Sequence, residues 1–436
     1  MIYNRDYLIL SKDKKDTFFI NNLFIKIVIC IIIIIILLSF KKNVFGLINN
    51  EYFINIKKNY NPIKWTQVNC NNSMGEIFKK VLKDNNLVAT SDEKWNLFIP
   101  CSYNKINYEI NTIHDYKNSN QRYIYIIDNA DQLAGKDNFW SNMVELYGIE
   151  TASKYIPLTY ILYDDKDIER FKKEYNKNTL YILKKNIQRQ LGLKITNDYD
   201  EIMNASKDNY VVVQYLLQDP YVIYGRKTNM RFYLLIICNK GEIACYVFDN
   251  GFMYYTAELF VKDSLDPVHH ITTGYIDRKV YEYSPLTHYD LKEYLDNYTN
   301  RELLESEKKV IDSGKKLSEY VFNNIYKTLT IVSIAQFNKI CNNKSIDDDI
   351  TFQLFGCDIA VDNKLDVKVI EINKGPDIGQ KDAKDGLIKY NMMNDMLAVL
   401  KIIDKPSHNY IKLCETSKSR NMTNVPHVID IVSDFL

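Results

Sequence analysis

Two carboxylates and an amide in the C-terminal half of the chain are spaced so that they could bind a divalent cation. Residues 354–376, LFGCDIAVDNKLDVKVIEINKGP, contain two apolar runs that flank a short polar turn, which is typical of an antiparallel hairpin. Because side chains alternate between the two faces of a strand, Asp358, Glu371 and Asn373 are expected to share one face. Such oxygen donors suit Mg²⁺ held jointly with phosphates. A hairpin whose polar face is only solvated is the alternative.

The register of this hairpin is expected to follow from its turn. With Asn363-Lys364 at the turn centre, Asp358 should lie opposite Val369 and diagonal to Glu371, and Gly356 would leave room for a ligand beside them. The other face should pack into the core through Ile359, Val361, Ile370 and Ile372.

Basic residues on two other segments could bind a phosphate group. Lys184 ends a β-type run and is followed by a polar loop that reaches Gly192, so its ammonium could contact nucleotide phosphates. Lys227, Asn229 and Arg231 open a later strand and would share one face of it, where they could clamp a phosphoryl group or a carboxylate. A surface lysine at Lys184 and an exposed strand edge with ordinary charges at Lys227–Arg231 are the alternatives.

The elements that must position these side chains alternate between strands and helices. Apolar runs predict strands over Tyr123–Ile127, Leu158–Leu162, Leu180–Leu183, Val211–Leu217, Arg231–Cys238, Ile243–Phe248, Phe352–Val361 and Leu365–Ile372. Apolar residues three and four apart predict helices over Phe139–Tyr147, Asp167–Tyr175, Leu291–Leu295, Lys308–Leu329 and Gly386–Ile403. This order indicates an α/β (α+β) fold.

A hydrophobic segment near the N-terminus is expected to anchor the chain in a membrane. Residues 23–40, LFIKIVICIIIIIILLSF, would form a helix ~27 Å long, close to the hydrocarbon thickness of a bilayer. A cleaved signal peptide and a buried core helix are the alternatives, and nearly balanced flanking basic residues leave the orientation open.

Composition excludes several classes of protein. The 436 residues carry 56 Lys+Arg against 55 Asp+Glu, and a net charge of +1 gives no electrostatic reason to expect nucleic acid as the partner. With 46% hydrophobic residues the chain is expected to fold, in two or three domains. Eight scattered cysteines without a C-x-x-C pair predict neither a zinc site nor a dense disulfide framework, and reduced thiols in the cytosol are expected.

Taken in order, these elements resemble the tubulin–tyrosine ligase-like family of ATP-grasp amino-acid ligases over residues 65–405. The most specific match is the hairpin, where the family pattern FGxD…(V/I)EhN…P corresponds to Phe355–Asp358 and Ile370–Pro376. The pattern VhQxYI…PhhhxGxKFDhRhY is similar to Val213–Leu216, Pro220, Gly225 and Lys227–Tyr233. Weaker matches, to the family's HLTN and RKD, are His270–Thr273 and Gly135–Asp137.

The resemblance implies ATP and Mg²⁺ as cofactors and a role for each matching residue. The Mg²⁺ ligands would be Asp358, Glu371 and Asn373. The ATP-binding residues would be Lys184, Gly192, Gln214, Tyr215, Leu216 and Lys227, with the adenine hinge at Gln214 to Leu216. The catalytic residues would be Arg231 and Lys227, and the substrates would contact Lys136, Asn229, His270, Thr272 and Thr273.

Four positions depart from the family pattern. Gln190 replaces the first glycine of the loop, Asn229 an aspartate, Tyr254 an arginine and Thr273 the asparagine of HLTN. The metal-binding positions are intact while the substrate-facing ones differ, which favours an active ligase with an altered substrate.

The resemblance also implies the organisation of the chain. An ATP-grasp fold with an N-terminal α/β domain would follow one transmembrane helix: a tail at 1–22, the helix at 23–40, a stalk at 41–63, the N-terminal α/β domain at 64–156, a central ATP-grasp subdomain at 157–226, a C-terminal ATP-grasp domain at 227–405 and a tail at 406–436.

The function implied is the ATP-dependent addition of Glu, Gly or Tyr to a protein carboxylate through an acyl phosphate, with the tubulin tail as one candidate acceptor. The catalytic domain of such a membrane-anchored enzyme is expected in the cytosol, where ATP and tubulin are found. Two rival functions stay open. One is a type II membrane glycosyltransferase, with Asp164-Asp165 or Asp347–Asp349 as its metal motif, and the other is a membrane-anchored pseudoligase that binds tubulin without catalysis.

Overall fold

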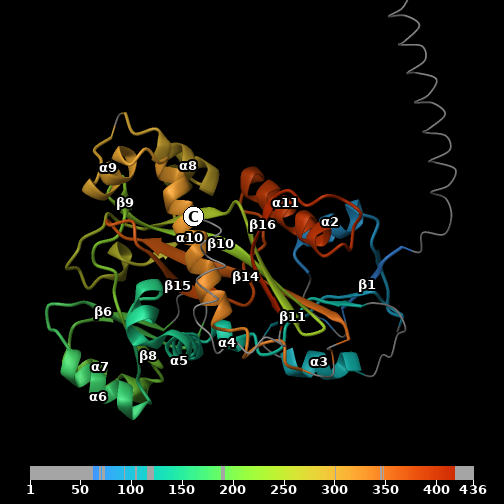
Figure 1. Cartoon of the computed structure of the whole chain (residues 1–436), viewed down its shortest axis with the longest axis horizontal. Coiled ribbons are helices and arrows are strands. Elements are labelled where there is room, and N and C mark those ends of the chain that lie inside the picture. Colours follow the sequence, from blue (N-terminus) through green and yellow to red (C-terminus); the bar gives the residue numbers. More distant parts are fainter. Residues whose placement is uncertain are drawn as a thin grey trace, which may run out of the picture. The chain divides into compact units, whose positions relative to one another are not determined.

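The computed structural model describes most of the chain between residues 62 and 417 (Figure 1). The described residues are 62–67, 70, 74–92, 94–103, 106–114, 122–187, 192–299, 301–343, 346 and 348–417. The predicted N-terminal tail, the predicted membrane helix at 23–40 and nearly all of the predicted stalk lie outside them. None of the helices in the described ranges is long and apolar enough to cross a membrane.

A large sheet runs through the unit that comprises Ile63–Leu436. Its longest strand, β10 (Arg226–Asn239), pairs antiparallel with β14 (Ile350–Val361), which pairs in turn with β15 (Val367–Asn373). Strand β10 also pairs with β9 (Val222–Ile223), β11 (Glu242–Phe248) and β12 (Phe252–Thr256). Beyond these, β13 (Thr272–Thr273) pairs with β12 and β16 (Tyr410–Ser417) pairs with β11.

The N-terminal region continues the same sheet through four short parallel strands. These are β1 (Lys64–Thr66), β2 (Val88–Ala89), β3 (Leu97–Phe98) and β4 (Tyr123–Ile124), and β4 pairs parallel with β14. The region predicted as an N-terminal α/β domain therefore shares a sheet with the C-terminal region.

Strand β10 is buried on both faces, which explains its near-continuous apolar sequence. Phe232, Leu234 and Ile236 belong to one core cluster together with residues of helix α10 (Leu317–Ile334). The alternate residues Tyr233 and Leu235 belong to a second cluster, formed with α2 (Glu76–Asp84) and α11 (Ala383–Val399). The sheet thus lies between two helical layers, of which α10 and the pair α2–α11 are visible in Figure 1.

A second, smaller sheet has four antiparallel strands in the order β5–β8–β6–β7. The strands are β5 (Thr159–Ile161), β6 (Tyr181–Lys184), β7 (Leu193–Thr196) and β8 (Val212–Tyr215). Aromatic residues on one face, including Tyr160 and Tyr181, pack on Phe171 of α6 (Asp165–Glu174). Ile182 and Lys184 lie on the other face, so that face is available for a ligand.

Most predicted elements are present with bounds shifted by a few residues. The remaining helices are α3 (Ile106–His114), α4 (Asp131–Ala134), α5 (Lys136–Tyr155), α7 (Tyr199–Asn204), α8 (His288–Asp296) and α9 (Glu305–Asp312). The single helix predicted over Lys308–Leu329 is wrong, because the chain leaves the helical conformation at Gly314 (φ +79°) and so forms α9 and α10. The polar tail predicted for 406–436 is wrong for Tyr410–Ser417, which pairs with β11 as β16.

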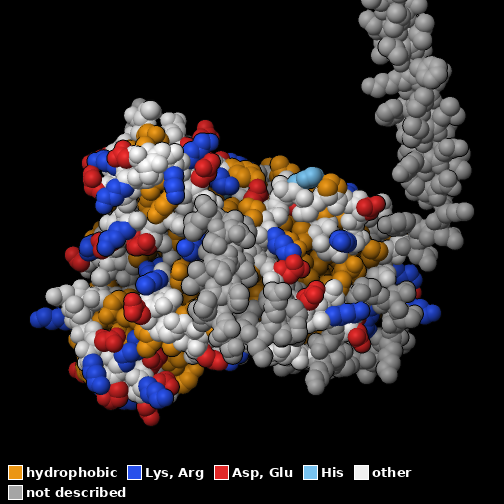
Figure 2. All heavy atoms as spheres, viewed as in Figure 1, with side chains coloured by type: hydrophobic (Ala, Val, Ile, Leu, Met, Phe, Trp, Pro, Cys, Tyr) orange, Lys and Arg blue, Asp and Glu red, His pale blue; other side chains and the backbone are white. Residues whose placement is uncertain are grey.

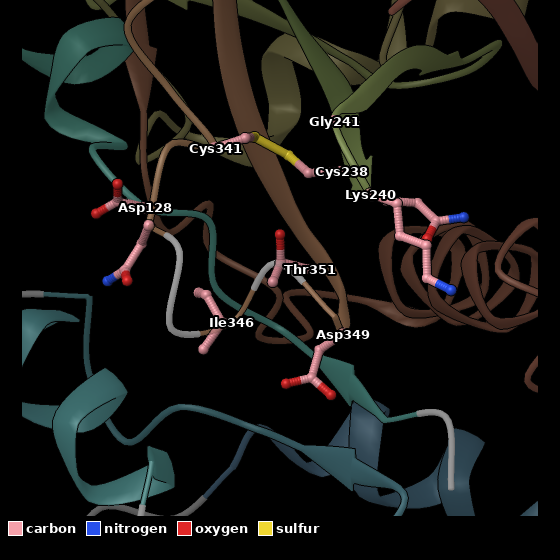
Figure 3. Close-up of a pocket in the computed structure, with 10 residues that line it drawn as sticks. Asp128, Cys238, Lys240, Gly241, Cys341, Ile346, Asp349 and Thr351 are labelled. Carbon is pink, nitrogen blue, oxygen red and sulfur yellow. A yellow bond between two sulfur atoms is a disulfide. The ribbon is translucent and has the colours of Figure 1, made fainter. Parts of the chain in front are cut away.

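The prediction of reduced, unpaired thiols is wrong for four cysteines. Cys70 and Cys101 form a disulfide with a Cα–Cα distance of 5.3 Å, and Cys238 and Cys341 form another at 6.2 Å. Figure 3 shows the second bond, which joins the end of β10 to the segment after α10 beside Asp128 and Thr351. Residues distant in sequence meet here, so spacing alone could not reveal the pairing. Buried free thiols are found at Cys245, Cys357 and Cys414.

The face of the molecule in Figure 2 carries interspersed acidic and basic side chains. This distribution fits the net charge of +1.

Candidate functional site

A β-bulge sets the geometry of the acidic hairpin formed by β14 and β15. Asp358 lies directly opposite Glu371, whereas the next residue, Ile359, pairs with Val369, so Ile370 is an extra residue. The predicted pairing of Asp358 with Val369 is therefore wrong. Ile370 lines a cavity instead of entering the core, and Val369 takes the core position that was predicted for it.

The predicted faces of β14 are confirmed. Ile359 and Val361 belong to the core cluster that includes α10, while Asp358 and Ala360 line the cavity on the opposite face. Gly356 has a different role from the one expected, because a Cβ there would come within 3.0 Å of Pro376 Cβ and 3.2 Å of the Arg231 guanidinium. The glycine therefore makes room for Pro376 and Arg231.

Arg231 and Asp358 form a bidentate ion pair across the register of β10 and β14. The Arg231 Nε and Nη2 atoms donate to the two carboxylate oxygens of Asp358 at 2.7 and 3.0 Å. Burial acts to lower the pKa of Arg231, but the Asp358 carboxylate together with Tyr254 and Tyr233 holds this pKa well above the usual value. The tyrosine at position 254 lies with its ring 5.2 Å from the same guanidinium.

Glu371 and Asn373 complete the acidic side of the hairpin. The Lys136 ammonium lies 3.7 Å from a Glu371 oxygen, and Asn373 is paired with Gly356. Within the described ranges, no three His, Cys, Asp or Glu side chains are grouped to hold a metal. The hairpin nevertheless presents two carboxylates and an amide to one cavity, a donor set of the hard oxygens that Mg²⁺ prefers.

The small sheet supplies a buried lysine that faces this hairpin. The Lys184 ammonium donates to Gln214 Oε1 at 2.6 Å and lies 3.5 Å from the backbone oxygen of Ile370. Gln214 is fixed in turn because its Nε2 donates to Thr159 Oγ1 at 2.8 Å. Burial lowers the pKa of Lys184 to about 8, although the Glu371 charge acts in the opposite direction.

Lys227 is a second buried cation beside the same cavity. It is 4% exposed, and its ammonium donates to the backbone oxygen of Leu217 at 3.2 Å. Burial, followed by repulsion from Lys184, lowers the pKa of Lys227 to about 7. Neither lysine has an ion-pair partner among the described residues. On the same strand as Lys227, β10, the buried Oδ1 atom of Asn229 accepts no hydrogen bond from any residue in the described ranges.

Two adjoining cavities contain most of the predicted site residues. The first, of about 100 Å³, lies between the two sheets and is lined by Lys184, Gln214, Tyr215, Leu216, Lys227, Asn229, His270, Thr272, Asp358 and Glu371 among others. The second, of about 560 Å³, shares Thr272, Asp358 and Glu371 and extends to Arg231, Thr273 and Asn373. We call these the inner cavity and the outer cavity.

Two predicted residues lie beside the cavities instead of lining them. Lys136 reaches the site through Glu371. Gly192 precedes Leu193, which lines both cavities, and has φ +73°, a conformation that favours glycine. Gln190 lies outside the described residues. His270 is held by its Nε2 contact with the Ser264 backbone oxygen at 2.8 Å.

Several lining residues were missed by sequence reasoning. Ile370 was assigned to the core, and Tyr275, Asp377 and Lys381 belong to loops with no regular pattern. The run Asp377–Asp385 follows the hairpin directly, and its charge was the available signal.

Fold and site together define a class of protein. A small antiparallel sheet faces a large sheet across a cavity, with buried Lys184 on the small sheet and buried Lys227 and the acidic hairpin on the large one. This mixed α/β arrangement fits an ATP-grasp-like fold.

Comparison with known proteins places the chain within this class. The tubulin-tyrosine ligase family matches residues 102–409, and the chain belongs to this family. A probable β-tubulin polyglutamylase of Tetrahymena thermophila is 26% identical over 270 residues, which cover 59% of this chain and 22% of the relative. A probable tubulin polyglutamylase, ttll-9, of Caenorhabditis elegans is 26% identical over 275 residues, 60% of this chain and 62% of the relative.

A third relative is named for a different amino acid. Tubulin glycylase 3B of Drosophila melanogaster is 23% identical over 257 residues, which cover 57% of this chain and 32% of the relative. The chain thus spans less than two thirds of the length of each of these three relatives.

Proposed function

We propose that this protein is an ATP-dependent ligase that adds glutamate or glycine to a carboxylate of a protein acceptor, with tubulin as the candidate acceptor. The observation that carries the proposal is the inner cavity, where Lys184 and Lys227 are buried without a carboxylate partner among the described residues and face Asp358 and Glu371. Buried ammonium groups are costly unless an anion compensates them, and a triphosphate would do so.

The nucleotide would lie between the two sheets. Its phosphates would contact Lys184 and Lys227, and its base would lie against the apolar lining near Leu216 and Ile370. The backbone N–H groups of Tyr215 and Leu216 already donate to Leu158 and Leu180, so the adenine hinge predicted at Gln214 to Leu216 would act through other atoms.

Asp358, Glu371 and Asn373 are the residues that would hold Mg²⁺, consistent with the donor set of the hairpin. When bound, Mg²⁺ would neutralise charge on the phosphate oxygens. The chain itself contributes the Arg231–Asp358 pair, which orients a guanidinium at the border of the outer cavity.

The chemistry would proceed in two steps. The γ-phosphoryl group would pass from ATP to the acceptor carboxylate, giving ADP and an acyl phosphate. The amine of the amino acid would then attack the acyl carbon, losing a proton and releasing phosphate as the amide forms. Arg231 and Lys227 would stabilise the negative charge that develops in both steps.

The choice of amino acid and acceptor rests on the relatives, whose names refer to tubulin polyglutamylation and glycylation. Tyrosine, the third amino acid expected from the sequence, has no such support among these three. The match to the tubulin-tyrosine ligase family favours the ligase over the glycosyltransferase.

Incubation of the full chain with tubulin and labelled amino acids tests the proposal. We expect ATP-dependent incorporation of glutamate or glycine into tubulin. Binding of ATP and tubulin without incorporation of any of the three amino acids would instead identify a pseudoligase, and binding of a nucleotide sugar in place of ATP would support the glycosyltransferase.

A further inference from the structure

The charges of the outer cavity are balanced except at one end. Asp358 is paired with Arg231, and Glu371 lies 3.7 Å from the Lys136 ammonium. Among the charged side chains that line this cavity, Asp377 and Lys381 remain. The sequence reasoning used neither residue.

Lys381 follows the acidic hairpin and presents its ammonium between two aromatic rings. The Nζ atom lies 4.5 Å from the ring centre of Tyr275 and 5.7 Å from that of Tyr254, and it donates to the Gly274 backbone oxygen at 3.1 Å. No carboxylate in the described part of the chain lies within ion-pair distance of it. Burial, followed by repulsion from Lys389, lowers the pKa of Lys381, while Asp377 and Asp385 act more weakly in the opposite direction.

The backbone is shaped to let this lysine approach. A Cβ atom at position 274 would come within 2.7 Å of Lys381 Nζ and 2.9 Å of the Tyr254 ring, so a larger residue there would shift the ammonium from this position. Tyr254 stands where the family resemblance places an arginine. Lys381, which belongs to another segment, supplies a positive charge beside Tyr254 in the outer cavity.

We propose that Lys381, held between Tyr254 and Tyr275, binds a carboxylate of the amino-acid substrate. The inference rests on the proposed ligase function and deepens it. Lys381 does not line the inner cavity, where Lys184 and Lys227 would receive the phosphates, so its ammonium is free for a different anion. An amino acid bound here would lie in the same cavity as Arg231 and Asp358.

Two carboxylates have the chemistry that this site requires. The α-carboxylate is common to glutamate and glycine, whereas the side-chain carboxylate belongs to glutamate alone. The same variant separates them, because loss of an α-carboxylate contact weakens both substrates and loss of a side-chain contact weakens only glutamate.

The test compares Lys381→Met with Lys381→Arg and with Lys279→Met, a control at an exposed lysine nearby that lines neither cavity. In the methionine variant at 381 we expect the KM for the amino acid to rise about 10- to 100-fold, the range for loss of a charge-assisted hydrogen bond. The KM for ATP should not change, Lys381→Arg should restore most of the affinity, and Lys279→Met should match the wild type.

A binding measurement keeps this inference separate from the proposed function. Saturation-transfer NMR with a non-hydrolysable ATP analogue reports binding of glutamate and glycine whether or not the chain turns over. A wild-type chain that binds an amino acid but never incorporates it would refute the ligase, while loss of that binding in Lys381→Met would still support the subsite. An unchanged amino-acid affinity in Lys381→Met, a change confined to ATP or the acceptor, or no amino-acid binding by the wild type would overturn the inference.

Discussion

At the scale of single residues, the site is defined by which charges have partners. Arg231 and Asp358 neutralise one another, whereas the hydrogen-bond acceptors of buried Lys184 and Lys227 among the described residues are all neutral. Glu371 lies between these groups, with Lys136 as its nearest cation. A ligand that carries several negative charges would balance the lysines, and three predictions follow from this arrangement.

Glu371→Gln is expected to reduce ATP turnover at least 10²-fold while leaving the fold intact. The change keeps the size of the side chain but removes a negative charge from the candidate cation site, and a preorganised contact of this kind contributes about 3–4 kcal/mol. Because Glu371 faces a cavity, the free energy of unfolding without nucleotide should change by less than ~1 kcal/mol. Steady-state ATPase assays and thermal unfolding measure both effects.

The control for Glu371→Gln is Glu305→Gln, at an exposed glutamate outside both cavities. Near-wild-type, amino-acid-dependent hydrolysis by Glu371→Gln would make the hairpin a structural feature.

Asn229→Asp is expected to be tolerated and to keep or raise ligase activity. The Oδ1 atom of Asn229 is buried without a donor, and the residue shares a face of β10 with Lys227 and Arg231. A carboxylate there would compensate Lys227 and would restore the aspartate of the family pattern. Activity and melting temperature of the variant are the measurements, and a loss of more than about 2 kcal/mol in stability, as for an unpaired buried charge, would contradict the expectation.

Nucleotide binding is expected to take up protons at pH 8. The pKa of Lys227 is lowered to about 7, so its side chain is mostly neutral at pH 8, and bound phosphates would favour the charged form. The apparent affinity should therefore fall as the pH rises from 7 to 9. The pKa of Lys227 is lowered only in the folded chain, so the unfolded chain binds more protons than the folded one in this window. The contribution of Lys227 to stability without ligand therefore increases with pH.

Calorimetric titration of the nucleotide in two buffers of different ionisation enthalpy measures the proton uptake on binding. Lys227→Met should reduce it, and equal uptake in that variant would assign the proton to another group.

At the scale of elements, the bulge in β15 decides what the hairpin presents to the ligand. Regular alternation would place Ile370 in the core, and the extra residue instead puts Ile370 and Glu371 on the cavity side. The backbone oxygen of Ile370 lies 3.5 Å from the Lys184 ammonium, so the bulge also links the two sheets.

Val369→Ala and Ile370→Ala are expected to have different effects, although the residues are neighbours. Val369 is fully buried in the core, so its truncation should reduce the free energy of unfolding by about 2 kcal/mol. Ile370 lines the inner cavity, so its truncation should cost less than ~1 kcal/mol of stability but weaken nucleotide binding. Chemical denaturation and nucleotide titration of both variants measure the difference. A larger loss of stability in Ile370→Ala than in Val369→Ala would restore the regular register.

For the molecule as a whole, the expected ligands and the cysteines bear on the compartment of the protein. A catalytic domain in the cytosol is our proposal, because ATP and tubulin are found there, and the candidate membrane segment at 23–40 lies outside the described residues. Two disulfides point the other way, since such bonds are typical of oxidising compartments. The Cys238–Cys341 bond closes a loop of 103 residues and would stabilise the fold by up to about 5 kcal/mol.

The cytosolic proposal predicts that the exposed Asn297, in its Asn-Tyr-Thr sequon, carries no glycan. Mass spectrometry of the protein isolated from cells measures this modification. A glycan on Asn297 would place the domain in the secretory lumen, and the cytosolic proposal would then be wrong.

The local features of the site follow from patterns along the chain. Alternation along β14 predicted which side chains face the core and which face a ligand, and the runs around Lys184 and Arg231 predicted strands that are present. These features depend on the period of a strand, which is a property of neighbouring residues.

Only the tertiary structure decided how distant segments meet. The bulge at Ile370, the Arg231–Asp358 pair, the two disulfides and the position of Lys381 in the outer cavity each join residues from different elements. No sequence period encodes such contacts, because they depend on how the strands pair and how the loops pack over the sheet. The charged residues that a substrate would meet could therefore be predicted from the sequence, whereas the residues with which they form ion pairs could not.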